Sequence, residues 1–242
     1  MVGEKIVILI PTYNEAPNIE RQLRGLNEAR NRVSGQAKFD VLIIDDRSPD
    51  DTAGIALGLG FPWVYLESPS EKAGLGNAYK YGFAWALTRG YSHVIEMDAD
   101  GSHKIEDLHK LLNADLELDL VIGSRWIDGG SIENWSRFRR IISRGGNFYA
   151  RAMLKLQIKD STSGFRRIST AVLRRIDFDS TDSAGYGFQI EIAYLIFRAG
   201  GSIIEVPICF AERIAGYSKM SIGIAYEAFI NITRIALRKN NV

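Results

Sequence analysis

The sequence predicts an α/β fold in which a mostly parallel sheet is covered by helices on both faces. The strand-like segments, such as residues 6–10 and 41–44, are continuously apolar, which is typical of strands buried on both sides. Strand-like and helix-like segments alternate regularly as far as residue 100, an order that favours parallel crossover units. The 242 residues show no internal repeat and no break in composition, so a single domain is the simplest organisation.

Taken in order, the apolar runs predict strands and the helical spacings predict the segments between them. Strands are expected at residues 6–10, 39–44, 63–66, 94–97, 118–123 and 203–206, with a short one between 160 and 168. The first helix is expected to follow Asn14 and to run to about residue 30, and the second to start within residues 48–52. Further helices are expected over 77–88, 105–113, 137–156, 188–198 and 220–238. Gly74-Leu75-Gly76 is expected as a loop and helix entry. Residues 1–219 form the predicted domain, and 220–242 a C-terminal amphipathic helix.

Composition and charge exclude some classes of function. Lys and Arg number 30 against 29 Asp and Glu, so a net charge of +1 gives no electrostatic case for nucleic acid. No stretch of 18 or more residues lacks charge, and the N-terminus lacks the layout of a signal peptide. The single Cys209 fits a reducing compartment. A cytoplasmic protein that meets a membrane from one side only is therefore expected.

Two aspartates stand where a predicted strand ends. Val94, Ile95 and Met97 form a short apolar run, and Asp98 and Asp100 follow it. Two crowded carboxylates repel each other unless a cation lies between them, and hard oxygen ligands suit Mg²⁺ or Mn²⁺, which take further ligands from phosphate and water. A simple turn that closes the strand is the alternative, because Asp and Gly both favour turns.

Polar clusters follow three of the predicted parallel strands. They are residues 11–15, Asp45-Asp46 and residues 98–100. In open α/β sheets, ligands bind beyond the carboxyl ends of the strands. The three clusters are therefore expected to converge on one rim.

Several motifs carry a resemblance to a known family. They are Pro11-Thr12-Tyr13-Asn14-Glu15, Asp45-Asp46-Arg47-Ser48-Pro49-Asp50, Asp98-Ala99-Asp100, Gly123-Ser124-Arg125, Arg139-Arg140-Ile141-Ile142-Ser143-Arg144-Gly145, Ser163-Gly164-Phe165-Arg166 and Arg213-Ile214-Ala215-Gly216-Tyr217-Ser218-Lys219. With these in order, the sequence resembles family 2 glycosyltransferases of the Rossmann-like GT-A fold. Within that family it is similar to the dolichol-phosphate (polyprenol-phosphate) mannose synthases.

The resemblance implies an inverting transfer of mannose from GDP-mannose to a polyprenyl monophosphate, with Mg²⁺ or Mn²⁺ as cofactor. It implies these nucleotide-sugar ligands: Pro11, Tyr13, Glu15, Ile44, Asp46, Asp98, Ala99, Asp100, Arg213 and Lys219. Asp98 and Asp100 would hold the metal, with Ser102 at a position where some relatives carry Gln. Arg125 and Arg139 would bind the acceptor phosphate and complete the catalytic set with the two aspartates.

The chemistry of such an acceptor predicts Arg or Lys side chains near its phosphate. A phosphate monoester has a second pKa of about 6, so it is ionised at neutral pH and needs no strong general base. It needs positive charge that brings two anionic substrates together, and Arg suits phosphate through its fork of donors.

For Arg137 and Arg140 a solvated helix face is the more natural interpretation. Arg213 and Lys219 suggest a flap over the phosphates, with an ordinary surface loop as the alternative. His93 and His103 are expected to be structural supports and not metal ligands.

The acceptor's lipid tail requires an apolar path to a bilayer. Candidates for an interfacial surface are Ile141, Ile142, Phe148, Tyr149, Met153 and Leu154, together with Ile222, Phe229, Ile232 and Ile235. Core packing is the competing interpretation. The expected partners are thus both substrates, the cytoplasmic face of a membrane and, by the resemblance, a small membrane-anchoring protein. Two alternative functions stay open: a polyprenyl-phosphate glucosyltransferase that uses UDP-glucose, and a non-catalytic nucleotide-sugar-binding subunit.

Overall fold

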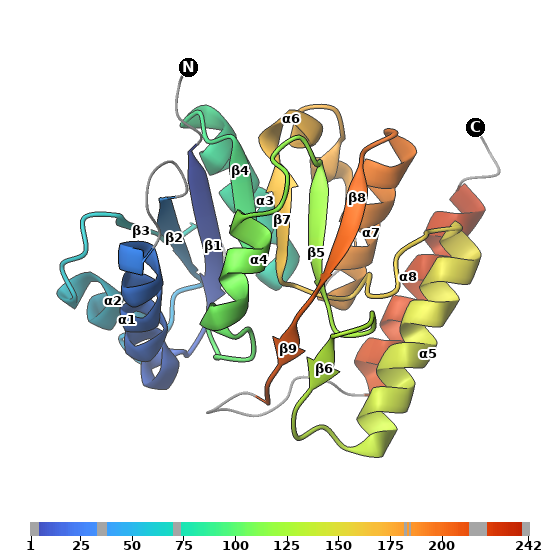
Figure 1. The fold of residues 1–242 in the computed structure, drawn as a ribbon, viewed down its shortest axis with the longest axis horizontal. Helices are drawn as coiled ribbons and strands as arrows, with labels where there is room; N and C mark the ends of the chain where they lie inside the picture. The colour runs from blue at the N-terminus through green and yellow to red at the C-terminus, as the bar shows by residue number, and fades with distance from the viewer. Residues whose placement is uncertain are drawn as a thin grey trace.

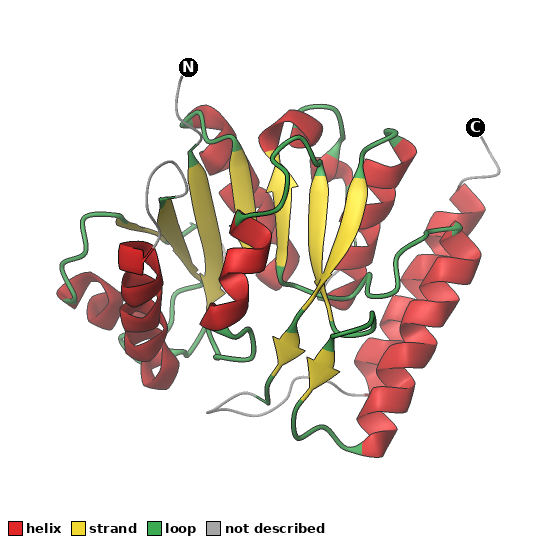
Figure 2. Ribbon diagram, viewed as in Figure 1, coloured by secondary structure: helices red, strands yellow, loops and turns green. Residues whose placement is uncertain are grey.

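A seven-stranded sheet forms the centre of the molecule (Figure 1; Figure 2). The computed structural model describes residues 5–32, 38–69, 74–181, 183, 185–212 and 222–238. The strands lie in the order β3-β2-β1-β4-β7-β5-β8. Their bounds are β1 (Ile6–Thr12), β2 (Phe39–Asp45), β3 (Val64–Glu67), β4 (His93–Glu96), β5 (Leu120–Ser124), β7 (Arg166–Ser169) and β8 (Ile203–Pro207). A small second sheet pairs β6 (Ser131–Ile132) with β9 (Cys209–Phe210).

The sheet is parallel except at one strand. β1 pairs in parallel with β2 and β4, β2 with β3, and β5 with β8. β7 lies between β4 and β5 and is antiparallel to both. The predicted mostly parallel α/β sheet is therefore confirmed, and the short strand expected near residue 166 is the one that reverses direction.

Helices cover both faces of the sheet (Figure 1). Their bounds are α1 (Ala16–Arg32), α2 (Thr52–Gly58), α3 (Gly74–Thr88), α4 (Leu108–Leu112), α5 (Arg137–Leu154), α6 (Thr170–Leu173), α7 (Tyr186–Arg198) and α8 (Ile222–Arg238), with 3₁₀ turns at Ile105–Asp107 and Phe178–Ser180. α3 begins at Gly74, so the expected helix entry at residues 74–76 is confirmed, but this stretch is already the first turn of the helix and not a loop. No helix in the described part of the chain is long and apolar enough to cross a membrane.

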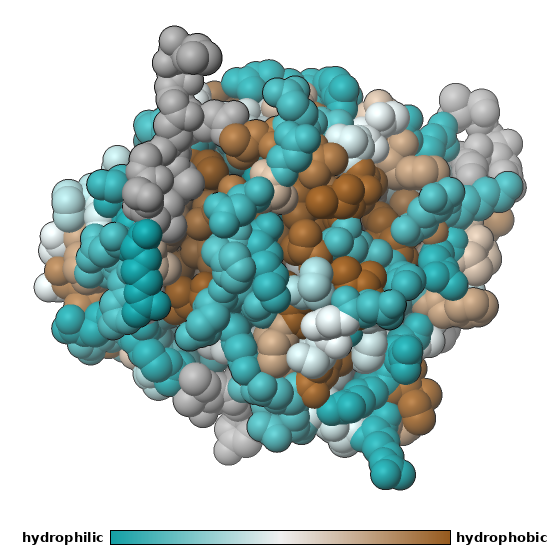
Figure 3. All heavy atoms as spheres, in the orientation of Figure 1, coloured by the Kyte–Doolittle hydropathy of each residue, from teal (hydrophilic) through white to brown (hydrophobic). Residues whose placement is uncertain are grey.

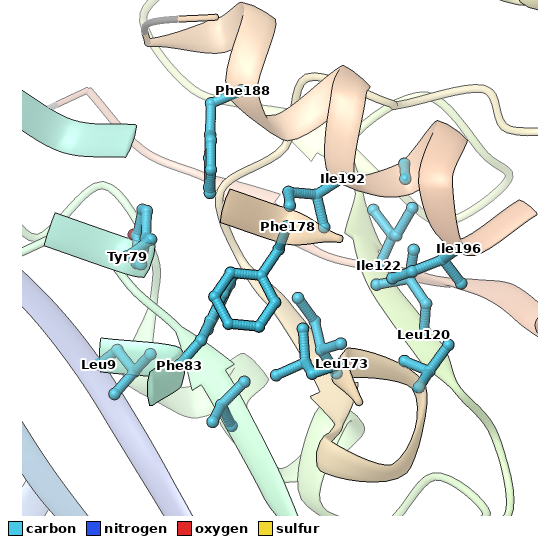
Figure 4. Close-up of a cluster of buried hydrophobic side chains, with 14 of the residues drawn as sticks. Leu9, Tyr79, Phe83, Leu120, Ile122, Leu173, Phe178, Phe188, Ile192 and Ile196 are labelled. Atoms are coloured by element: carbon cyan, nitrogen blue, oxygen red, sulfur yellow. The ribbon is translucent and has the colours of Figure 1, made fainter. Parts of the chain in front are cut away.

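Two hydrophobic cores explain why the strands are apolar without alternation. Val7 and Leu9 of β1 belong to one core, beneath α3 and α7, while Ile8 and Ile10 belong to the other, beneath α1 and α4. Successive side chains of a strand point to opposite faces, so a strand covered on both sides needs apolar residues at every position. The first core is rich in aromatic rings (Figure 4), and Phe83 meets Phe178 edge to face with 5.5 Å between centroids.

The two long helices α5 and α8 pack side by side at one edge of the molecule (Figure 1). The ring of Tyr149 on α5 stacks on Phe229 of α8 at 4.4 Å, and its hydroxyl lies 2.8 Å from Thr233 Oγ1. Ile232 turns into the core. α8 is therefore anchored to the domain, and the predicted C-terminal helix is present.

The residues proposed for an interfacial surface divide between the core and the solvent. Ile141 is 69% exposed and Phe148 65%, and Phe229 on α8 is 48% exposed. Leu154 and Ile232 are buried, as the core-packing alternative expected. The side chain of Ile222 lies outside the described residues. Figure 3 shows apolar surface also over the β5 and β8 side of the sheet, next to the polar side chains that cover α1 and α4.

Candidate active site

A pocket of about 440 Å³ lies at the carboxyl ends of β1, β2 and β4. Eight of its lining residues are ones predicted from the sequence: Pro11, Tyr13, Glu15, Ile44, Asp46, Asp98, Ala99 and Asp100. The other lining residues are Thr12, Gly74, Leu75, Ala78, Thr162, Gly164, Gly185 and Gln189. The three polar clusters thus share one rim, as expected from a parallel sheet.

Asp50 and Thr52, which follow β2, hold the backbone beside the pocket residues Tyr13 and Glu15. The N–H of Glu15 donates to Thr52 Oγ1 and that of Ala16 to Asp50 Oδ2, both over 3.0 Å. Burial would raise the pKa of Asp50, but hydrogen bonds from Thr52 and Ala16 outweigh it and lower the pKa. Asp50, which is distant in sequence, therefore satisfies an N–H at the start of α1 and fixes the backbone beside Tyr13.

The adjacent aspartates at the end of β2 have different environments. Asp45 is 2% exposed, and its Oδ1 accepts from Thr12 Oγ1 over 2.8 Å and from Ser48 Oγ over 2.6 Å. Asp46 lines the pocket, and its Oδ2 accepts from the N–H of Gly74 over 3.4 Å. Asp45 thus joins the ends of β1 and β2, while Asp46 faces the space where a ligand would bind.

The Asp98-Ala99-Asp100 turn presents its carboxylates unequally. The Asp98 side chain is 37% exposed, whereas Asp100 is 4% exposed and accepts from the N–H of Ser102 over 2.9 Å. Ser102 is buried and is not among the residues that line the pocket. Its role as a metal ligand stays a prediction.

His103 supports this turn from below. Its Nδ1 accepts from the backbone N–H of Asp98 over 3.0 Å, and its ring stacks on Phe165 with 5.0 Å between centroids. Burial lowers the pKa of His103 to about 4, so the ring is neutral. Since a peptide N–H can only donate, Nδ1 carries no proton and Nε2 does. His93, the other histidine expected to be a structural support, begins β4 at the end of the strand away from the turn, and its Nε2 lies 3.1 Å from the carbonyl of Leu116.

Arg125 is held rigidly beside the pocket. Its Nε and Nη2 donate to the two oxygens of Asp160 over 2.7 and 2.6 Å, and Nη2 also donates to Thr162 Oγ1 over 2.9 Å. Arg125 is 5% exposed and Asp160 is fully buried. Arg125 does not line the pocket itself, but Thr162 does. The guanidinium of Arg125 is therefore connected to the pocket lining by its hydrogen bond to Thr162.

Arg139, the second residue predicted to bind the acceptor phosphate, lies with Arg125 against the ring of Trp135. The guanidinium of Arg139 lies 3.9 Å from the centroid of Trp135, and that of Arg125 lies 5.5 Å from it. Phe210 meets Trp135 edge to face at 5.4 Å. The structure therefore brings Arg125 and Arg139 together, next to the pocket and outside its lining.

The remaining predicted cations have simpler positions. Arg213 and Lys219 lie outside the described residues, so the flap stays a prediction. Arg137 and Arg140 are exposed, and Nη2 of Arg140 donates to the carbonyl of Ile132 over 2.8 Å. This placement agrees with the solvated helix face preferred for these two residues.

Sequence reasoning missed two residues of the pocket floor. Gly164 lies in the turn before β7, and a Cβ there would come within 3.8 Å of Asp98 Oδ1 and 3.9 Å of Gln189 Nε2. Gln189 is 2% exposed, and its side-chain atoms form no hydrogen bond of normal geometry within the described part of the chain. Gln189 and Glu191 interrupt the apolar segment 188–196, and this interruption was the only indication of Gln189 in the sequence.

A buried arginine ties this floor together. Arg166 donates from Nε to the carbonyl of Ser163 over 2.9 Å and from Nη1 to that of Gln189 over 2.8 Å. Its Nε lies 3.5 Å from Glu96 Oε2, and both side chains are fully buried. Burial raises the pKa of Glu96 to about 7, although Arg166 opposes the shift. β4, β7 and α7 therefore meet beneath the pocket through one guanidinium.

A comparison with known families identifies the chain. Residues 7–177 match the model of the family described as glycosyl transferase family 2. The chain belongs to glycosyl transferase family 2. The matched segment runs from β1 through β7 and contains the pocket except for Gly185 and Gln189.

Several members of the family are similar over most of this glycosyltransferase. An undecaprenyl-phosphate mannosyltransferase of Micrococcus luteus is 45% identical over 235 residues, which are 96% of this chain and 94% of that protein. A polyprenol monophosphomannose synthase of Mycolicibacterium smegmatis is 41% identical, with 97% of this chain and 88% of that protein covered. A dolichol-phosphate mannosyltransferase of Pyrococcus furiosus is 33% identical, with 96% of this chain and 63% of that protein covered.

The fold also matches solved structures. Glucosyl-3-phosphoglycerate synthase from Mycobacterium tuberculosis in complex with UDP superposes with a TM-score of 0.68 at 18% identity, covering 97% of this chain and 80% of that one. The same enzyme with Mn²⁺, UDP-glucose and phosphoglyceric acid gives a TM-score of 0.67 at 18% identity over 97% and 80% of the two chains. At this identity the likeness concerns the fold alone, and it confirms the predicted GT-A fold.

Proposed function

We propose that this glycosyltransferase moves mannose from GDP-mannose to the phosphate of a polyprenyl monophosphate, with inversion at the anomeric carbon. The observation that carries the proposal is the 45% identity, along nearly the whole chain, to an undecaprenyl-phosphate mannosyltransferase. The pocket at the carboxyl ends of β1, β2 and β4 supports it, because its size and its polar rim suit a nucleotide-sugar.

In the proposed reaction an oxygen of the acceptor phosphate attacks the anomeric carbon. The bond from that carbon to the diphosphate oxygen breaks, and GDP leaves with the electron pair. The acceptor oxygen is already ionised near neutral pH, so no general base is needed. Asp46 and Tyr13 would bind the nucleoside, and Arg125 and Arg139, gathered around Trp135, would attract the acceptor phosphate.

The donor atoms fit a divalent cation. Asp98 and Asp100 both line the pocket, and Mg²⁺ and Mn²⁺ favour carboxylate oxygens, with the remaining positions filled by phosphate and water. A divalent ion bound there would stabilise negative charge on the departing diphosphate. Within the described part of the chain, no third His, Cys, Asp or Glu side chain joins the two aspartates to form a metal-binding group, so phosphate and water would have to supply the remaining ligands.

The lipid acceptor implies contact with a membrane, which we place at the α5 and α8 edge. The exposed apolar side chains there include Phe138 (66%), Ile141 and Phe148 on α5 and Leu237 (61%) on α8. Arg137, Arg140 and Arg144 are exposed on the same α5 helix. An apolar stripe flanked by cations suits the surface of an anionic bilayer. We propose a peripheral position at the cytoplasmic face, with α8 as an interfacial helix and a small anchoring protein as a partner; the other residues of the predicted segment 220–242 lie outside the described part of the chain.

A transfer assay tests the proposal. Purified protein with Mg²⁺ or Mn²⁺ is mixed with undecaprenyl phosphate and either labelled GDP-mannose or labelled UDP-glucose, and the label in the organic phase is counted. Label from GDP-mannose alone is the expected result. Label from UDP-glucose alone would favour the glucosyltransferase alternative. An Asp100→Ala variant that supported full biological function would instead favour a non-catalytic subunit.

A further inference from the structure

A second pocket, of about 310 Å³, lies beside α5 and is not part of the site described above. Its lining residues are Trp126, Arg144, Asn147, Phe148, Arg151 and Lys159. Four of them stand at residues 144, 147, 148 and 151, a spacing that puts them along one side of α5. Trp126 comes from the segment after β5 and Lys159 from the loop that leads to β7. Three elements thus meet at this pocket, which we call the α5 pocket.

The α5 pocket is strongly cationic. Arg144, Arg151 and Lys159 all line it, and no acidic residue does. None of the three forms an ion pair with a carboxylate from the described residues. Lys159 contacts the carboxylate of Glu205 only through its backbone N–H, which donates to Oε2 over 2.8 Å. Three like charges side by side repel one another, so a bound anion would stabilise this arrangement.

Besides the three cations, the α5 pocket has a hydrogen-bond donor in its wall and apolar residues at its opening. The indole N–H of Trp126 is buried and has no acceptor within the described part of the chain. The guanidinium of Arg144 lies 5.2 Å from the Trp126 ring, and that of Arg151 lies 5.8 Å from the Phe148 ring. Because Phe148 is 65% exposed, the pocket opens beside apolar surface. A ligand that is anionic at one end and apolar beyond it would suit such a site.

The α5 pocket also adjoins the candidate active site. Asn147, which is 3% exposed, donates from Nδ2 to Thr162 Oγ1 over 3.0 Å. Thr162 lines the larger pocket and accepts from Arg125. The two pockets are therefore separated by one hydrogen-bonded layer, formed by Asn147 and Thr162.

We propose that the α5 pocket binds a lipid-borne phosphate at the membrane surface, in addition to the groups assigned to the donor and acceptor. Arg144 and Arg151 offer planar forks of donors to phosphate oxygens, and Lys159 adds a point charge. The source of the phosphate is either an anionic phospholipid or the polyprenyl phosphate before it reaches Arg125. The inference is independent of which sugar the enzyme transfers.

Vesicle binding tests the proposal with matched variants of equal charge. Binding of the full chain is measured by flotation with phosphatidylcholine vesicles alone, with added phosphatidylglycerol, and with added undecaprenyl phosphate, at one ionic strength. The triple variant R144Q/R151Q/K159Q removes the cations of the α5 pocket. The control R137Q/R140Q/K155Q removes three exposed cations from the same helix and its end that do not line the pocket. Thermal unfolding checks that both variants are folded.

The pocket variant should bind anionic vesicles about tenfold more weakly than the control variant. Loss confined to undecaprenyl phosphate would identify the acceptor as the ligand, and loss with phosphatidylglycerol as well would identify a general headgroup site. Equal losses in the two triple variants would overturn the proposal, because they would show only long-range attraction. The single exchange Lys159→Glu, compared with Lys155→Glu, repeats the test with a smaller change. Because no sugar is transferred in this assay, its failure leaves the proposed activity untouched.

Discussion

The backbone N–H of Asp98 donates to Nδ1 of His103 over 3.0 Å, so a neutral histidine fixes the turn that presents the carboxylates. His103→Phe keeps a ring against Phe165 but leaves this N–H without its acceptor, which costs about 1–3 kcal/mol. We expect GDP binding in the presence of Mn²⁺, measured by calorimetry, to weaken about tenfold. His103→Gln, whose carbonyl oxygen can accept, should lose less. Unchanged affinity in His103→Phe would show that the hydrogen bond does not position Asp98.

Gly164 offers a test of the pocket floor that leaves the fold intact. A methyl group at this position would meet Asp98, His103 and Gln189 at 3.8–3.9 Å, an ordinary contact distance. Gly164→Ala should therefore change the free energy of unfolding by less than about 0.5 kcal/mol. Because the methyl group takes space beside Asp98, GDP-mannose binding should weaken by about tenfold.

Gly145→Ala is the matched control for that exchange. Gly145 lies in α5, and apart from its chain neighbours and the helix's own backbone no atom of the described residues lies within 4 Å of the added Cβ. Alanine is the better helix former, so stability should rise by about 0.5–1 kcal/mol while nucleotide binding is unchanged. Equal binding by Gly164→Ala and Gly145→Ala would contradict the assignment of the pocket.

The buried pair of Arg125 and Asp160 should matter for stability as well as for activity. Asp160→Asn leaves the guanidinium of Arg125 buried without its anion, so we expect the free energy of unfolding to fall by about 3–5 kcal/mol. Urea denaturation measures the change. Glu20→Gln breaks the exposed pair with Arg24 and should cost less than about 0.5 kcal/mol. Similar small losses in both variants would mean that the Arg125–Asp160 pair contributes little.

His93 should make the fold sensitive to acid. Burial, followed by the charge of Arg167, lowers the pKa of His93 from its usual 6.5 to about 4. Between these two pH values the unfolded chain binds a proton that the folded chain does not. The stability from this group is thus complete above pH 6.5 and is lost as the pH falls to about 4.

His93→Gln removes this titration. The loss of unfolding free energy between pH 7 and pH 4 should be smaller in the variant, by up to about 3 kcal/mol. Urea denaturation at both pH values, for the wild type and the variant, gives the difference. An identical loss in the two proteins would show that His93 does not contribute.

The sequence by itself determined the parallel part of the sheet and the position of the pocket. Continuous apolar runs such as residues 6–10 report burial on both faces, and alternation with helices makes the strands parallel. Once the strands are parallel, their carboxyl ends share one edge. Tyr13, Asp46 and Asp98 are then brought to a common rim, although they are far apart in the chain.

Tertiary structure decided what depends on contacts between distant residues. Periodicity reports only local geometry, so it did not show that β7 enters antiparallel between β4 and β5 or that Gln189 reaches the pocket floor. Asp45 and Asp46 are identical in type, and only their surroundings give them different roles. Asp45 accepts a hydrogen bond that joins β1 to β2, whereas Asp46 lines the pocket. Likewise, the pairing of Arg125 with Asp160, 35 residues away, is a product of folding, because only the folded chain removes both charges from water together.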